Sequence, residues 1–260
     1  GDAFSACCTS FDCLERTTSF QVLLLAWTPD KQNLEVMDQT LEKGSTVQVL
    51  APNKIDAPSG KNVRFKFSEG SPTSITTMQE QGVSSFDTVL IDVASEDDDT
   101  PDASDSRALA VANLVMKAHK QSGAGTKLRV IISLHNPDSV QLLERIAGTN
   151  PDVHFEPLLS TDLEAGATVQ VMWNPDLQVV YGDLMDPDGC EIFFADSSFF
   201  GPPGVKQTFG QISERAQKHN AIAMGIRTRD GRLKLNPSKT QSIKLQEGDQ
   251  VVVFYDHDSK

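Results

Sequence analysis

The sequence lacks the long hydrophobic run that a membrane-spanning helix requires. Its longest apolar stretches cover residues 22–27 and 251–255, far below the roughly 18 residues that such a helix needs. It is also poor in positive charge, because 23 Lys and Arg stand against 36 Asp and Glu in 260 residues, a net charge of −13. So acidic a surface repels a phosphate backbone, which argues against nucleic-acid binding.

Cysteines are few, and their spacing fits neither a disulfide framework nor paired zinc knuckles. Cys7, Cys8 and Cys13 lie near the start and Cys190 stands alone. A metal site built on the first three would need a fourth ligand, and no histidine is near them. Residues 1–19 also lack a basic region followed by an apolar one, so we interpret them as a trimmed or excised start.

From Phe20 onward, strand-length apolar runs alternate with amphipathic stretches, a pattern typical of βα units around a parallel sheet. The predicted strands are 21–27, 46–50, 63–67, 88–93, 128–134 and 153–157. The predicted helices are 33–41, 72–81, 106–120 and 139–147, the last capped by Asp138. The sequence therefore predicts an α/β fold with a doubly wound, Rossmann-like sheet over residues 20–160.

The pattern changes after residue 160. Residues 161–204 predict a connecting segment, with helices over 161–172 and 175–185, a strand over 190–194 and a Gly/Pro linker. Residues 205–260 predict a small α+β lobe, with a helix over 210–219 and strands over 221–228, 233–235 and 250–255. The Asp230-Gly231 pair between two of these strands indicates a tight hairpin.

The first predicted βα turn lacks the glycines with which a Rossmann domain approaches a dinucleotide. It reads AWTPDKQN, with Trp27 and Pro29 in the turn itself, so an NAD site of the usual kind is disfavoured. The sequence has no GxSxG elbow and no Walker loop, and its histidines lack metal spacing. We expect each of them to be a surface or capping residue: His119, His135, His154, His219 and His257. No enzymatic function is supported.

The C-terminal lobe carries the most specific motifs. TFGQISERAQKHNAIAMGI (208–226) is followed by GRLKLNPSKTQSIKLQEGDQVVVFYD (231–256). This order of helix, strand, Asn236-Pro237 step, spacer and Gly248-Asp249 turn before a last strand resembles the C-terminal lobe of regulator-of-K⁺-conductance (RCK) domains. Asn-Pro and Gly-Asp are also good turn formers on physical grounds.

The N-terminal lobe is similar to the Castor and Pollux ion channels of plants. FDTVLIDVASEDDDTPDASDSRALAVANLV (86–115) has their strand, acidic loop and helix-opening Asp105-Ser106-Arg107 step. The strand that contains Gly189-Cys190-Glu191 and the Trp27 turn also match, and the likeness runs in order over about residues 20–256.

This resemblance implies a regulatory module in a ring of paired RCK domains below a channel pore, with Ca²⁺ as the suggested ligand. It implies self-association or pairing with other RCK domains, and a position on the cytosolic, nucleoplasmic or stromal side of a membrane. The pore would lie upstream in a longer chain or in a separate one. Either the chain is an excised gating domain or it is a relative that has lost its channel. A non-enzymatic scaffold subunit of a larger assembly remains the alternative.

Two regions are candidate sites. Residues 92–105 contain seven carboxylates and no Lys or Arg at the carboxyl end of a predicted strand, which favours a hard cation such as Ca²⁺. The candidate ligands are Asp97, Asp98, Asp99 and Asp102. Asp105 and Arg107 are predicted to start a helix, either in an interface or ligand role or simply as a cap and a surface charge.

Charge is also divided along the chain. Residues 146–205 hold ten acids and no Lys or Arg, whereas residues 206–260 hold ten Lys and Arg against six acids. An EF-hand around Asp186 fails, because its first and last ligands would fall on Leu184 and Ala195. The basic hairpin with Arg227 and Arg229 is predicted to face an acidic surface, either of the other lobe or of a neighbouring subunit.

Overall fold

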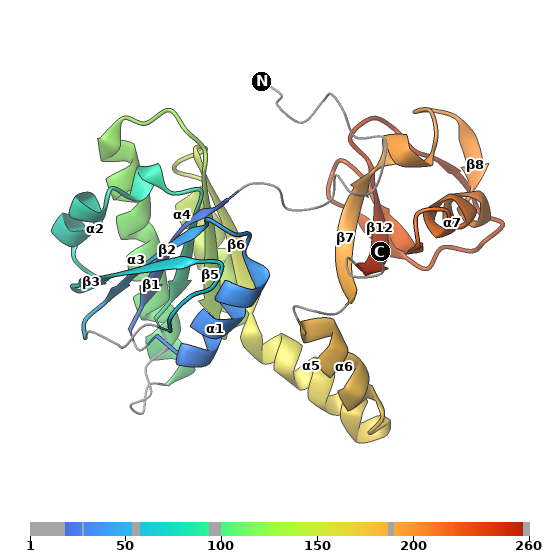
Figure 1. Ribbon diagram of the computed structural model, residues 1–260. Helices are drawn as coiled ribbons and strands as arrows, with labels where there is room; N and C mark the ends of the chain where they lie inside the picture. The colour runs from blue at the N-terminus through green and yellow to red at the C-terminus, as the bar shows by residue number, and fades with distance from the viewer. Residues whose placement is uncertain (1–18, 28, 54–57, 94–99, 187–189, 257–260) are drawn as a thin grey trace. The chain divides into compact units, whose positions relative to one another are not determined.

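The computed structural model describes residues 19–27, 29–53, 58–93, 100–186 and 190–256. It divides into two compact units, the first ending at Leu177 and the second beginning at Gln178, and each is described by itself (Figure 1).

The first unit is built on a six-stranded parallel sheet with the order β3-β2-β1-β4-β5-β6. The strands are β1 (Gln21–Ala26), β2 (Thr46–Ala51), β3 (Arg64–Glu69), β4 (Thr88–Asp92), β5 (Leu128–Leu134) and β6 (Val153–Leu159). This order confirms the predicted doubly wound, Rossmann-like sheet.

Helices cover both faces of this sheet (Figure 1). They are α1 (Lys31–Thr40), α2 (Ile75–Gln81), α3 (Pro101–Ser122) and α4 (Pro137–Ala147), with a 3₁₀ turn η2 (Val83–Ser85) after α2. Because side chains alternate along a strand, β1 serves two cores. Leu23 packs in the core with α2, α3 and α4, whereas Leu24 packs with Leu34 of α1.

Two helix starts differ from the prediction. Helix α3 begins at Pro101 rather than residue 106, because the Thr100 hydroxyl accepts a hydrogen bond from the Ala103 N–H and proline suits the first turn. Helix α4 is capped by Asn136 rather than Asp138, since the Asn136 side chain accepts from the Asp138 N–H at 2.9 Å.

The predicted helix pair is present as α5 (Ser160–Trp173), in the first unit, and α6 (Leu177–Met185), whose residues from Gln178 on lie in the second. Helix α5 ends before Pro175, as expected where proline disfavours helix at the residue before it.

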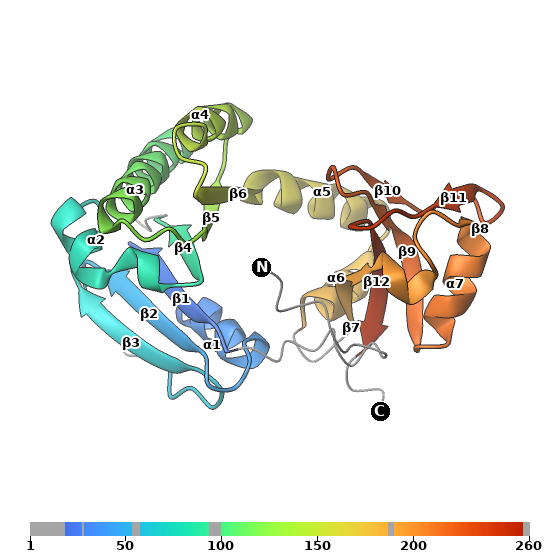
Figure 2. The same cartoon turned by 90° about the horizontal axis from the view of Figure 1, so that it is seen from above.

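The second unit contains an antiparallel sheet with the order β10-β9-β12-β7. Its strands are β7 (Cys190–Asp196), β9 (Ala221–Arg227), β10 (Leu233–Leu235) and β12 (Gln250–Asp256). Helix α7 (Phe209–Gln217) lies against one face (Figure 2), where Phe209, Ile212 and Ala216 are buried. The strand predicted in the connecting segment is β7, and it pairs with β12 over its whole length.

Two strands of three residues each, β8 (Lys206–Thr208) and β11 (Ser242–Lys244), form a separate pair that the sequence did not predict. A 3₁₀ turn, η3 (Ser197–Phe200), follows β7. The β9–β10 hairpin is confirmed, with Gly231 at φ +84° in its turn.

Candidate functional site

The carboxyl ends of β1 and β4 mark the point where the strand order of the first sheet reverses. Neighbouring strands β1 and β4 run in register to Ala26 and Asp92, and the chain winds outward from them in opposite directions. Open α/β sheets bind their ligands in the crevice at this switch point.

In this protein the crevice is occupied by the chain's own side chains. The guanidinium carbon of Arg107, on α3, lies 5.0 Å from the ring centroid of Trp27, which directly follows β1. The same guanidinium donates to the Val93 carbonyl at 3.0 Å, and both side chains are half-buried. Arg107 therefore lies within α3 and is half-buried. The expectation that it is a surface charge at the helix start is wrong.

The start of α1 is also unsuited to a phosphate. Asp30 caps this helix by accepting from the Gln32 N–H at 2.9 Å. A dinucleotide would place its pyrophosphate at this helix end, where the Asp30 carboxylate already accepts from the Gln32 N–H and repels a second anion.

Asp105 is a buried structural carboxylate and does not cap α3. It is 2% exposed and lies in the second turn of that helix. Its oxygens accept from the backbone N–H groups of His135 (2.8 Å) and Asn136 (2.9 Å) and from His135 Nδ1 (3.1 Å). These bonds tie α3 to the loop between β5 and α4.

Burial raises the pKa of Asp105, but the hydrogen bonds from the Ser139 side chain and from His135 and Asn136 outweigh it, so the pKa lies below its ordinary value. The carboxylate is therefore held in its charged form, as an acceptor for the loop.

Of the four predicted metal ligands, the structure describes Asp102 alone. Asp97, Asp98 and Asp99 lie outside the described residues. Asp102 is exposed in the first turn of α3 and accepts from Asn136 Nδ2 at 3.4 Å. Among the described residues, no group of three or more His, Cys, Asp or Glu side chains could hold a metal ion.

The two arginines predicted at an interface lie on the β9–β10 hairpin. Both are exposed, and Arg227 places its guanidinium carbon 5.1 Å from the centroid of the Phe194 ring. The Arg229 N–H donates to Asp249 Oδ1 at 3.0 Å, and the buried Asp249 also accepts from the Gln246 N–H at 2.7 Å. The buried Asp249 side chain of the predicted Gly248-Asp249 turn thus holds the β9–β10 hairpin through the Arg229 N–H.

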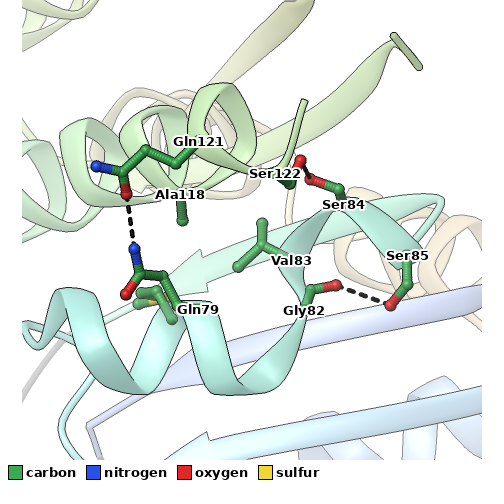
Figure 3. Close-up of a pocket in the computed structure, with 9 residues that line it drawn as sticks. Gln79, Gly82, Val83, Ser84, Ser85, Ala118, Gln121 and Ser122 are labelled. Carbon is green, nitrogen blue, oxygen red and sulfur yellow. Dashed lines mark hydrogen bonds between the residues drawn. The ribbon is translucent and has the colours of Figure 1, made fainter. Parts of the chain in front are cut away.

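A cavity of about 550 Å³ that the sequence gave no sign of lies between α2, η2 and the end of α3 (Figure 3). Its lining side chains carry no charge, and Gln79 donates to Gln121 across it at 2.7 Å. Beside it the Ser84 hydroxyl contacts Ser122 Oγ at 2.6 Å and Nδ1 of His119 at 2.9 Å. His119 is 2% exposed, so the expectation that it lies at the surface or caps a helix is wrong.

Helices α5 and α6 contain no buried residue, although their own apolar side chains project from all sides. Met172 and Trp173 on α5 are 75% and 90% exposed, and Val179 and Met185 on α6 are 77% and 78% exposed. A helix that is apolar on all sides normally requires cover from another surface. The apolar composition of these two helices could have indicated a contact surface from the sequence, but no such prediction was made from it.

In the part of the chain that the structure describes, no helix is both long and apolar enough to span a bilayer.

Comparison with solved structures gives the fold. The chain is similar to the human SLO3 gating ring, with a TM-score of 0.56 and 12% identity over 90% of this chain and 44% of that one. This chain therefore spans less than half of the gating-ring chain, and at this identity the likeness shows the fold alone.

Two Rossmann-type proteins are also similar over part of the chain. One is a nucleoside-diphosphate-sugar epimerase from Agrobacterium tumefaciens, with 9% identity, a TM-score of 0.41, and coverage of 54% of this chain and 52% of that one. The other is a Rossmann-fold NAD(P)-binding family protein from Shigella flexneri, with 18% identity, a TM-score of 0.36, and coverage of 53% and 66%. These two scores are too low to bear on function.

Comparison with protein families gives a more specific result. Residues 162–260 match the family described as Castor and Pollux, part of voltage-gated ion channel. The predicted resemblance to the Castor and Pollux family is therefore confirmed over residues 162–260, in a chain with the fold of a gating-ring domain.

Proposed function

We propose that this chain is a regulatory, ligand-sensing domain of the gating-ring type that acts on a Castor/Pollux-like cation channel from the cytosolic, nucleoplasmic or stromal side of its membrane. The observation that carries this proposal is the Castor and Pollux match over residues 162–260, in a chain with gating-ring architecture. A ligand that binds one ring conformation more tightly than another shifts the population between them, and linkers to the pore transmit the shift.

We also propose that the domain is not an enzyme. The crevice that serves Rossmann-fold enzymes is filled by Trp27 and Arg107, and Asp30 occupies the phosphate position at α1. These contacts support a sensor or scaffold over a nucleotide-dependent enzyme. Titration with NAD, followed by Trp27 fluorescence, tests this point, and saturable binding would contradict it.

Ca²⁺ is the proposed ligand, and the acidic segment 92–105 is its proposed site. Hard cations take six to eight oxygen ligands, which a carboxylate-rich loop can supply. Thermal unfolding with and without millimolar Ca²⁺ tests the proposal, since a ligand that binds the folded state alone raises the melting temperature. The triple variant Asp97→Asn/Asp98→Asn/Asp99→Asn should abolish the shift.

The control for Ca²⁺ binding is the variant Asp176→Asn, which removes an exposed carboxylate elsewhere and should retain the shift. If neither Ca²⁺, Mg²⁺, K⁺ nor nucleotides change the melting temperature, the scaffold alternative is favoured instead.

Assembly with other RCK-type domains is also part of the proposal, supported by the exposed apolar side chains of α5 and α6. Replacing Trp173 or Val179 by aspartate should lower the oligomeric state measured by light scattering on a sizing column. The control is Leu142→Asp on α4, which removes a side chain that is 48% exposed and should leave the oligomeric state unchanged.

Association with a channel can be tested by chemical cross-linking in native membranes, followed by mass spectrometry. Cross-links from this chain to a pore-forming polypeptide are expected. Cross-links confined to proteins without a pore would support the scaffold alternative.

A further inference from the structure

Strand β10 forms one edge of the antiparallel sheet in the second unit. The sheet has the order β10-β9-β12-β7, so in the part of the chain that the structure describes no strand lies beyond β10. All three residues of β10 are exposed, with Leu233 at 54% and Leu235 at 55%. Backbone groups on such an edge are available for pairing with another chain.

The bonds to β9 identify these backbone groups. The Thr228 N–H donates to the Arg232 carbonyl at 2.9 Å, and the Asn236 N–H donates to the Met224 carbonyl at 2.7 Å. Hydrogen-bonded and non-hydrogen-bonded pairs alternate along an antiparallel ladder. Lys234, midway between these two bonds, therefore also directs its backbone N–H and C=O groups toward β9.

Leu233 and Leu235 occupy the alternate positions, so their N–H and C=O groups point away from β9. Among the described residues, no hydrogen bond to another element uses these four groups. The edge therefore presents two donors and two acceptors, which is the set that an added strand uses in peptide recognition by β-augmentation.

The side chains around this edge are strongly basic. Residues 227–244 contain six Lys and Arg and a single acid, Asp230, in a chain with a net charge of −13. Asp230 already pairs with Arg232 at 2.8 Å, whereas Lys234 donates to the uncharged Gln241 at 2.8 Å. Antiparallel pairing of β10 with a second copy of itself would place Lys234 against Lys234 of that copy, which is unfavourable. The charge of the edge fits an acidic partner instead.

The register also defines the order of side chains in that partner. Directly opposite residues of neighbouring strands share one face of a sheet, so two residues of an added strand would contact Leu233 and Leu235. The residue between them would lie on the opposite face, beside Lys234. On this side Lys234 takes part in a non-hydrogen-bonded pair, in which side chains lie closest. The fitting segment is therefore extended and reads apolar, acidic, apolar.

We propose that the outer edge of β10 binds an extended acidic segment of a partner protein, which adds to the sheet as an antiparallel strand. An acidic side chain of the segment pairs with Lys234, and the apolar residues on either side of it contact Leu233 and Leu235. This contact is separate from the proposed assembly through α5 and α6, and it does not depend on Ca²⁺ binding or on a channel.

A synthetic peptide tests the charge rule. Fluorescence anisotropy of a labelled peptide with the core Val-Glu-Val-Glu-Val should show saturable binding, and replacing its glutamates by lysines should weaken binding at least about tenfold. Lys234→Glu should reverse the preference between the two peptides. The control is Lys206→Glu, which makes the same charge change at an exposed position on β8 and should retain the preference for glutamate.

A second pair of measurements tests the backbone pairing. Leu233→Pro removes an outward N–H and no bond to β9, and proline is tolerated at the first residue of an edge strand. It should weaken peptide binding at least about tenfold, whereas Leu233→Val keeps the N–H and should bind within about threefold of wild type. If Leu233→Pro lowers the melting temperature, N-methylation of the peptide valines removes the donors from the peptide instead, leaves the protein unchanged, and should weaken binding as much.

The proposal is overturned if the glutamate peptide does not bind the wild-type protein at up to about 1 mM, or if the lysine peptide binds equally well. Binding that weakens in salt but is unaffected by Leu233→Pro and by N-methylation would indicate charge attraction without strand pairing, and would also overturn it. Because Ca²⁺-dependent melting is measured separately, failure of this contact leaves the proposed sensing function intact.

Discussion

Asp105 offers a sharp test of how the first unit is held together. Its two carboxylate oxygens serve two backbone donors, the N–H groups of His135 and Asn136. In Asp105→Asn one oxygen becomes an NH₂ group, which faces one of these donors instead of accepting from it. The side chain keeps nearly the same size, so the change isolates hydrogen bonding from packing.

The cost follows from burial, because Asp105 is 2% exposed. A buried donor left without an acceptor costs about 1–3 kcal/mol, and at least one such donor is created: the Asn136 N–H, if the remaining oxygen faces the N–H and Nδ1 of His135. We therefore expect Asp105→Asn to lower the free energy of unfolding of the first unit by about 2 kcal/mol. Asp102→Asn, on the exposed side of the same helix, should cost under about 1 kcal/mol.

The pH dependence gives a second, independent measurement. Since the pKa of Asp105 is lowered in the folded state, its carboxylate contributes stability that is fully present above the unfolded pKa of about 4. That contribution is lost as the pH falls through the folded pKa. The difference between wild type and Asp105→Asn should therefore be constant from pH 7 to about pH 5 and shrink below about pH 4.

Urea unfolding followed by Trp27 fluorescence measures these differences. Trp173, which is 90% exposed, is replaced by phenylalanine in all samples, so that the signal comes from Trp27 alone. A difference below about 0.5 kcal/mol at pH 7, or one that does not change down to pH 3, would refute the structural role assigned to Asp105.

Three further changes should act through different contacts. Arg107→Ala removes the cation over Trp27 and a donor to a buried carbonyl, so a loss of about 2 kcal/mol and a shift in Trp27 emission are expected. Gly225→Ala forces a Cβ against the Lys234 carbonyl and should lower the free energy of unfolding of the second unit by about 1–3 kcal/mol, measured by urea unfolding. Burial raises the pKa of Asp38, but three backbone N–H donors and a nearby lysine outweigh it, so the pKa is lowered. Asp38→Asn should therefore be less stable than wild type at pH 7, by about 1–3 kcal/mol in urea unfolding, and the gap should close below about pH 4.

The central strands β1, β2 and β4 could be predicted because they are largely buried on both faces, and such strands appear as continuous apolar runs. Strand β5, whose residues alternate between buried and more exposed positions, begins and ends where it was predicted. Short strands carry too few residues for any periodicity to show. For that reason β8 and β11, at three residues each, were missed, whereas the equally short β10 was predicted from the Asp230-Gly231 turn before it.

The roles of the site residues were harder to predict, because they depend on partners that are distant in the sequence. Thr100 and Pro101 carried a readable helix start, but the prediction followed the apolar face that begins at Leu109 and placed the start five residues too late. That Asp105 binds the loop at His135, thirty residues on, depends on strand order rather than on any local pattern.

Filling of the switch point restricts where a ligand could bind the first unit. Trp27 and Arg107 occupy the space between the ends of β1 and β4, so a ligand at this edge has to sit outside the crevice, over the residues that follow β4 and β5. There the described residues offer the exposed carboxylates of Asp102 and Asp138 and the partly exposed ring of His135, while Asp105 is committed to the backbone. Two carboxylates fall short of the six to eight oxygens that Ca²⁺ takes. A Ca²⁺ site at this edge therefore requires the carboxylates of residues 96–99, which is why the Asp97, Asp98 and Asp99 substitutions, rather than a change at Asp105, decide whether the domain senses Ca²⁺ here.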